Sequence, residues 1–150
     1  MRILCTLLLM FLAVPFGSAQ SFDSKRDPGA DLRAAMTEAQ RTGKHILLDV
    51  GGDWCIFCQQ MGEFFRQKPD LAKLRDDNFV VVPVYYGDDN KNPQFLSHYA
   101  KPQGIPHFYV LDDHGRPLHS QHVLELRDGS VFSPEKMKAF LLHWAPSTTQ

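Results

Sequence analysis

The sequence contains few cysteines, only one long apolar run and no block of basic residues. Its three cysteines are Cys5, Cys55 and Cys58. Lys and Arg total 16 against 17 Asp and Glu, which gives a formal net charge of -1. Without a basic patch, nucleic acid is not expected to be a principal partner. What the sequence does have is 150 residues with 43% hydrophobic content, which is enough for one globular domain.

The single apolar run lies at the beginning of the chain. Arg2 precedes it, and Pro15 and the small residues 17–19 follow it. This pattern predicts a secretory signal peptide over residues 1–19, too short to serve as a membrane anchor. Cleavage after Ala19 would remove Cys5 and leave one possible disulfide, in an oxidising compartment. We expect a flexible lead-in over residues 20–29 and a domain over residues 30–146, with no stable membrane anchoring after cleavage.

Helices and strands are expected to alternate along that domain. The helices are marked by their caps and by apolar residues at helical spacing. One runs from Asp27-Pro28 to Gly43, and others cover about 55–68, 93–100 and the segment after Ser133; Pro69 starts a further turn or short helix. Strands are predicted at 45–50, 79–86, 107–112 and 118–123, the second at an edge because Pro83 cannot donate to a sheet. The order predicts an α/β fold around a small mixed sheet of about four strands.

The pair Cys55 and Cys58 is placed between a buried strand and the start of a helix. A helix N-terminus stabilises an anion, so the thiolate of Cys55 should form at lower pH than that of a free cysteine. Cys58, one turn further and expected to be more buried, would stay protonated. Two alternatives remain open. One is a zinc site completed by His119 and His122, and the other is a structural disulfide, although so small a ring stabilises little.

Two segments carry a resemblance to a known family. "ILLDVGGDWCIFC" (46–58) and "GIPHFYVLDDHGRPL" (104–118) resemble the two signatures of the thioredoxin superfamily. The variant with an N-terminal helix and a D-W-C-x-x-C motif is similar to secreted thioredoxin-like proteins and to the C-terminal domain of the bacterial membrane thiol reductase. The similarity covers roughly residues 30–145 and implies a thioredoxin-like fold.

The resemblance also implies roles for individual residues. Cys55 would be the nucleophile and Cys58 the resolving thiol. Asp49 would be a buried carboxylate that takes a proton from Cys58. The expected substrate-binding residues are Trp54, Ile56, Phe57, Ile105 and Pro106, of which Pro106 would be a cis-proline that exposes the backbone of Ile105 to an extended substrate segment.

Three features depart from the family. The residues between the cysteines are Ile56 and Phe57, with no histidine or lysine to hold a thiolate. Many relatives pair the buried aspartate with a lysine on the next strand, but that region here reads Val82-Pro83-Val84. His107 follows the proline, where it either tunes the site or simply packs in its strand.

These observations predict a secreted, periplasmic thiol–disulfide oxidoreductase that needs no cofactor or metal. Reduction or isomerisation of protein disulfides is favoured over oxidation. Its partners would be proteins with disulfides or thiols and a protein that recycles the redox pair. The alternative is a redox-inert thioredoxin-like binding module with a structural disulfide.

Overall fold

The structure is a computed structural model that describes residues 22–147. Four strands form a mixed sheet in the order β2-β1-β3-β4. They are β1 (His45–Gly51), β2 (Phe79–Tyr85), β3 (His107–Leu111) and β4 (Pro117–His122). β1 runs parallel to β2 and antiparallel to β3, which is antiparallel to β4. The predicted α/β fold with a four-stranded mixed sheet and an N-terminal helix is therefore confirmed.

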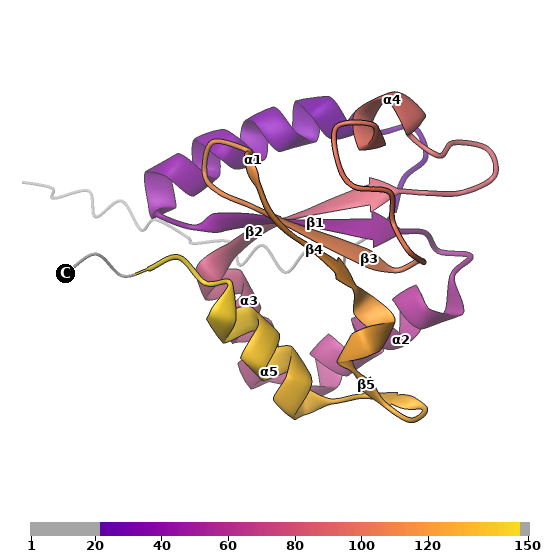
Figure 1. Cartoon of the computed structure of the whole chain (residues 1–150), viewed down its shortest axis with the longest axis vertical. Coiled ribbons are helices and arrows are strands. Elements are labelled where there is room, and N and C mark those ends of the chain that lie inside the picture. The colour runs from indigo at the N-terminus through magenta and orange to yellow at the C-terminus, as the bar shows by residue number, and fades with distance from the viewer. Residues whose placement is uncertain (1–21, 148–150) are drawn as a thin grey trace, which may run out of the picture.

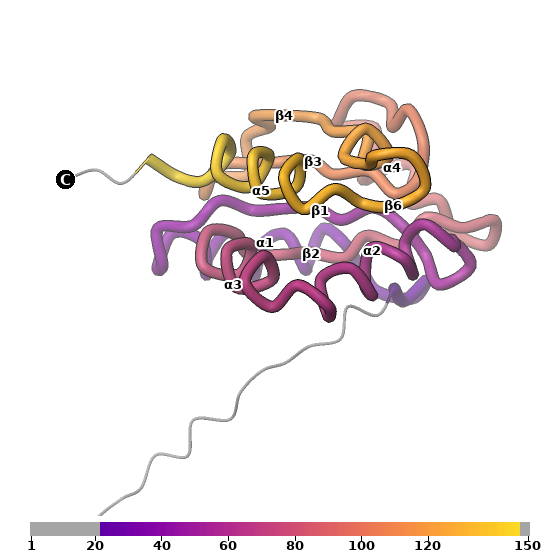
Figure 2. Tube along the Cα trace, turned by 90° about the horizontal axis from the view of Figure 1, so that it is seen from below, coloured from indigo at the N-terminus to yellow at the C-terminus, as the bar shows by residue number. Residues whose placement is uncertain are grey.

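Helices cover both faces of the sheet (Figure 1). On one face lie α1 (Pro28–Thr42) and the short α4 (Pro93–Leu96), and on the other lie α2 (Ile56–Gln67), α3 (Pro69–Asn78) and α5 (Pro134–His143). Figure 2, viewed from the side of α2, α3 and α5, shows these three helices across the sheet. Two hydrophobic clusters, one on each face, are the core.

Local sequence signals account for the ends of the helices. Asp27 caps α1 by accepting a hydrogen bond from the Gly29 amide, and Gly43 ends that helix in the left-handed conformation with φ of 69°. Ser133 caps α5 in the same way through the Lys136 amide. The predicted ends of α1 and the predicted start of α5 are confirmed, and α3, expected as a turn or short helix from Pro69, is a helix of 10 residues.

The position of Pro83 is also as predicted. It lies in β2, at one edge of the sheet, where a missing backbone donor costs nothing on the open side. β1, in contrast, is a central strand and is almost wholly buried. Since β1 leads directly into the loop that carries the cysteines, a central, buried strand of the sheet positions the site.

The region between β4 and α5 contains elements that were not predicted. A 3-10 helix covers Val123–Leu126, and the two-residue strands β5 (Arg127–Asp128) and β6 (Val131–Phe132) form a small hairpin around Gly129, whose φ is 59°. The Asp128-Gly129 pair is a recognised turn signal and could have indicated this hairpin. The predicted signal peptide, in contrast, lies outside the described residues. Within residues 22–147, none of the helices combines the length and the apolar character needed to cross a membrane.

Candidate active site

Cys55 and Cys58 are joined by a disulfide at the start of α2. Cys55 is the N-cap residue of the helix, and its sulfur accepts a hydrogen bond from the backbone N–H of Cys58 at 3.2 Å. The Cα atoms are 5.2 Å apart, within the range a disulfide requires. When the pair is reduced, the same N–H and the helix dipole would stabilise a thiolate on Cys55.

The two cysteines are buried to a similar degree. The expectation that Cys58 is the more buried one is wrong, since Cys55 is 4% exposed and Cys58 is 8% exposed. The depth of each residue in α2 therefore does not by itself distinguish the two sulfurs.

Hydrogen bonds hold the loop that precedes the pair. The Trp54 indole N–H donates to the Tyr86 carbonyl at 2.8 Å, and the Tyr86 amide donates to the Gly51 carbonyl at 2.6 Å. Trp54 lies against Gly52, because a Cβ at that glycine would collide with the indole nitrogen. The Trp54 ring nevertheless stays 58% exposed, so a fixed aromatic surface borders the disulfide.

The two residues between the cysteines lie in different surroundings. Ile56 is 58% exposed, which leaves an apolar side chain on the surface beside Trp54. Phe57 is half-buried, and the Arg127 guanidinium of the β5–β6 hairpin lies 4.7 Å from the centre of its ring. Sequence reasoning missed Arg127 because the contact joins segments 70 residues apart in the chain.

Pro106 is buried, and the Ile105–Pro106 peptide bond is cis. In the antiparallel register of β1 and β3, Val50 pairs with His107. Pro106 therefore lies at the end of the sheet where β1 leads into the cysteine loop. The half-buried Ile105 precedes it on the side away from the strand, so the fold brings the two signature segments to the same end of the sheet.

Asp49 is a buried carboxylate in the middle of β1, only 6% exposed. It shares a face of the sheet with Leu47, which packs in the same cluster as α2. Burial raises the pKa of Asp49 to about 7, and the positive charge of Arg75 opposes this in part. A carboxyl group that titrates near neutral pH on the side of Cys58 can both accept and return a proton.

Arg75, in α3, was not recognised from the sequence. Its guanidinium lies 4.4 Å from the centre of the Phe65 ring in α2, and its side chain is only 14% exposed. The expected lysine partner is missing from β2, where Asp49 pairs with Pro83. A cation on a helix thus acts on the carboxylate in place of one on a strand, and no spacing rule in the sequence would have indicated it.

His107 packs inside the sheet and does not contact solvent. Its ring lies 4.7 Å from that of Tyr109, and its Nε2 is 2.8 Å from the Ser120 hydroxyl oxygen. Burial, with smaller contributions from His122 and His119, lowers the pKa of His107 to about 4, and Glu125 opposes this in part. His107 is therefore neutral near pH 7, and of the two roles considered for it the geometry favours packing.

His119 and His122, considered above as the completion of a zinc site, are both half-buried. The His119 ring stacks on Trp144 with centroids 4.4 Å apart, and the Nε2 atom of His122 is buried. Among residues 22–147, the group of three or more potential metal ligands that lies close enough together is Asp112, Asp113 and His114. The two cysteines and these histidines are not such a group.

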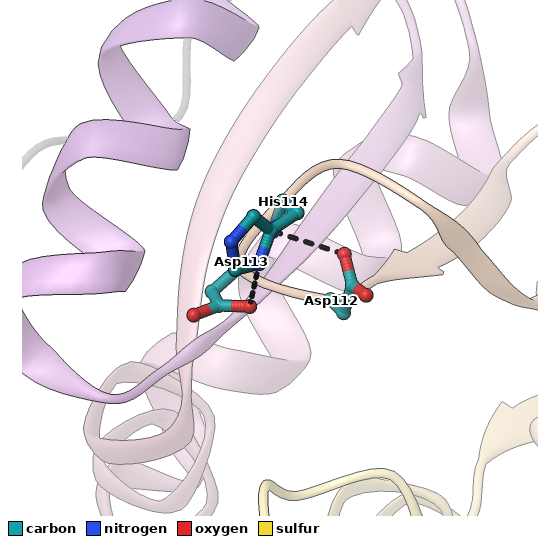
Figure 3. A group of neighbouring side chains, drawn as sticks. All are labelled: Asp112, Asp113 and His114. Carbon is teal, nitrogen blue, oxygen red and sulfur yellow. Dashed lines mark hydrogen bonds and ion pairs between the residues drawn. The ribbon is translucent and has the colours of Figure 1, made fainter.

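The Asp112–Asp113–His114 group lies in the turn after β3 (Figure 3). Asp112 accepts hydrogen bonds from the amides of His114 and Arg116, each at 2.9 Å, and Asp113 accepts one from the His114 ring at 2.7 Å. These contacts explain the group as part of a tight turn.

Comparison with known proteins supports this description. A family model described as Thioredoxin-like matches residues 27–113. The chain is 25% identical over 103 residues to the thiol:disulfide interchange protein DsbD of Escherichia coli K12, covering 69% of this chain. It spans 18% of the length of that relative.

Two solved structures are similar to this fold. One, described as a disulphide isomerase from Xylella fastidiosa Temecula1, has a TM-score of 0.69 at 25% identity and covers 81% of this chain and 94% of its own. The other is the oxidised C-terminal domain of DsbD from Neisseria meningitidis, with a TM-score of 0.57 at 20% identity, covering 81% and 97%. Fold and redox pair together support thiol–disulfide oxidoreductase chemistry. The chain belongs to the thioredoxin-like family.

Proposed function

We propose that this protein exchanges disulfides with other proteins through Cys55 and Cys58. The observation that carries the proposal is the closed pair at the N-cap of α2, where the Cys58 amide donates to the sulfur of Cys55. A structural disulfide has no need of a buried carboxyl group with a pKa of about 7 on the same side of the sheet. Such a group is useful to a site that must move a proton during each exchange.

The exchange begins with the reduced protein. The Cys55 thiolate attacks one sulfur of a partner disulfide, a bond forms between Cys55 and the partner, and the other partner sulfur leaves as a thiolate. Cys58 then gives its proton to Asp49 and attacks the Cys55 sulfur. This closes the Cys55–Cys58 disulfide and releases the second partner sulfur, so the partner gains two electrons and the protein loses two.

Substrate docking is assigned to the surface around the pair. Trp54 and Ile56 are exposed apolar side chains beside the disulfide, Phe57 supports them, and Ile105 with cis-Pro106 would pair with an extended substrate segment. Partners would be proteins that carry disulfides or thiols, together with a protein that recycles Cys55 and Cys58. Reduction or isomerisation is favoured, because no histidine or lysine lies between the cysteines to stabilise the thiolate strongly.

We place the protein in the bacterial periplasm. The signal-peptide pattern of residues 1–19 supports export, and the relatives compared above come from bacteria with such a compartment. A disulfide would persist there. Fractionation of cells that express the full chain, with the N-terminus of the exported form sequenced, tests both export and cleavage after Ala19.

A trapping experiment tests the exchange reaction and the roles of the two cysteines. In the Cys58→Ser variant, mixed disulfides between Cys55 and a disulfide-containing model protein such as insulin should accumulate. In Cys55→Ser no mixed disulfide should form. A redox titration in glutathione and dithiothreitol buffers, followed by Trp54 fluorescence, should give a potential between roughly -120 and -270 mV. Absence of mixed disulfides together with a potential below about -300 mV would support the alternative, a redox-inert binding module with a structural disulfide.

A further inference from the structure

Phe22 lies beside the sulfur of the resolving cysteine. The contact is made across Gly51, the last residue of β1. A Cβ atom at Gly51 would be 2.8 Å from the sulfur of Cys58 and 2.8 Å from Cζ of Phe22. The ring and the sulfur therefore approach the same point on the backbone, and they cannot be further apart than twice that distance. A side chain at position 51 would collide with both.

The segment that carries Phe22 is held in place by several contacts. The Asn90 side-chain amide donates to the Ser24 carbonyl at 2.9 Å, and the Lys25 amide donates to Asp23 at 2.9 Å. Arg26 then forms an ion pair with Asp31 in α1 at 2.7 Å. These contacts fix residues 23–26 against the loop after β2 and the start of α1, so the ring of Phe22 has a defined approach to Gly51.

This contact adds a second difference between the two sulfurs. Cys55 and Cys58 are buried to a similar degree, yet the Cys55 sulfur accepts the amide of Cys58, while Cys58 has an aromatic ring close to its sulfur. An apolar neighbour disfavours the thiolate and blocks the approach of a second molecule. The approach across Gly51 brings both effects to Cys58.

We propose that Phe22 is a positioning residue that covers the Cys58 sulfur, so that exchange with a partner begins at Cys55. The inference rests on the proposed function and adds to it a residue that directs the order of attack. Phe22 lies outside residues 27–113, the part of the chain that matches the family. The protection of the resolving thiol is thus supplied by this chain's own N-terminal segment.

The cover acts at two points in the reaction. While Cys58 is a thiol, Phe22 keeps it protonated and out of reach, so the partner's disulfide is attacked by the Cys55 thiolate. Once Cys55 is bonded to the partner, its sulfur lies within reach of Cys58 without passing the ring, because both sulfurs belong to the same turn of α2. Cys58 then loses its proton to Asp49 and displaces the partner thiolate, and no other reactant is needed.

The test measures Cys58 as a single thiol. In a Cys55→Ser background, the rate at which iodoacetamide alkylates Cys58 is followed from pH 6 to pH 10 by peptide mass spectrometry. Phe22→Ala should speed alkylation at pH 7 about tenfold and move the pH profile about one unit lower, because one pKa unit is a factor of ten in thiolate. Phe22→Leu, which retains an apolar side chain, should restore most of the protection.

A matched control separates this role from general stabilisation. Phe95 is also half-buried, but it packs against Tyr99 with ring centroids 5.5 Å apart. Phe95→Ala should leave the alkylation profile of Cys58 unchanged. Equal profiles for Phe22→Ala and its parent, in protein with an unchanged circular dichroism spectrum, would overturn the proposal. So would an equal acceleration by Phe95→Ala, which would indicate a loss of stability.

Alkylation of Cys58 does not require exchange activity. A failure of the role assigned to Phe22 can therefore be distinguished from a failure of the proposed function. A second measurement uses the reduced protein with both cysteines and a brief exposure to oxidised glutathione. The first adduct should be on Cys55 in the parent, and a larger share should be on Cys58 in Phe22→Ala. An unchanged share in the variant would contradict the proposed control of the order of attack, even if Cys55 and Cys58 prove to be an active redox pair.

Discussion

Asp49 and Pro83 are register partners in the parallel pair of β1 and β2. The strand next to the buried carboxylate thus offers neither a cation nor a backbone donor at this position. Burial is the dominant effect on the carboxyl group and raises its pKa to about 7. Because an ordinary aspartate titrates near 3.9, Asp49 is a destabilising group at neutral pH, retained at the candidate active site.

The first prediction concerns Asp49→Asn and stability. The folded pKa is raised, so as pH rises from about 4 to 7 the unfolded chain loses a proton that the folded chain keeps, and stability falls over this window. The variant lacks this loss. The free energy of unfolding of the variant minus that of the parent should be about 2–3 kcal/mol more positive at pH 8 than at pH 5. Urea denaturation of the oxidised protein measures it.

The same variant should be a poorer catalyst. Without a proton acceptor near Cys58, resolution of the mixed disulfide should slow by a factor of about 10² at pH 7. Stopped-flow measurement of the release of the partner thiolate checks this step separately from the first attack. A variant that is more stable but resolves at the parent rate would contradict the role assigned to Asp49.

The second prediction concerns Arg75, whose charge lowers the pKa of Asp49. Arg75→Gln should raise that pKa above about 7, and the pH at which resolution is half-maximal should move upward with it. Arg75→Lys keeps a positive charge and should move it less. The carboxyl titration of Asp49, followed by carbon-detected NMR in both variants, measures the effect directly. A pKa unchanged in Arg75→Gln would show that burial alone sets it.

The third prediction concerns Trp54, an exposed ring fixed by its hydrogen bond to the Tyr86 carbonyl. Trp54→Ala should lower kcat/KM for a protein disulfide about tenfold, because buried aromatic residues dominate protein interfaces. The rate with bis(2-hydroxyethyl) disulfide, a small substrate with no apolar surface to pack on the ring, should change by less than about twofold. Trp54→Phe keeps an aromatic ring but removes the hydrogen bond to Tyr86. Comparison with Trp54→Ala separates the contribution of the ring to substrate docking from its contribution to the structure of the loop.

Much of the fold could be predicted from local sequence signals. Asp27 and Gly43 marked α1, Ser133 marked the start of α5, and Pro83 marked an edge strand, because each of these residues acts through its own backbone. The cysteine pair could be placed at a helix start for the same reason. Capping and proline geometry are local, and local rules can be applied to a sequence.

The missing parts of the site depend on contacts between distant segments. Arg75 reaches Asp49 from another helix, Arg127 covers Phe57 from the β5–β6 hairpin, and Phe22 meets Cys58 across Gly51. Side-chain burial also follows from tertiary packing, which is why the relative exposure of Cys55 and Cys58 was predicted wrongly. None of these relationships is encoded by spacing along the chain.

The fourth prediction concerns His107 and acid stability. Its folded pKa of about 4 lies below the ordinary 6.5. As pH falls from 6.5 to 4, the unfolded chain therefore binds a proton that the folded chain does not, and stability falls over that window. His107→Gln removes this titration and keeps an amide that can bond to Ser120. Between pH 7 and pH 4.5 the variant should lose about 2 kcal/mol less than the parent. Urea denaturation at the two pH values measures it. His98→Gln, at an exposed position, should follow the parent curve, and parallel curves for His107→Gln and the parent would show that His107 takes up its proton while still folded.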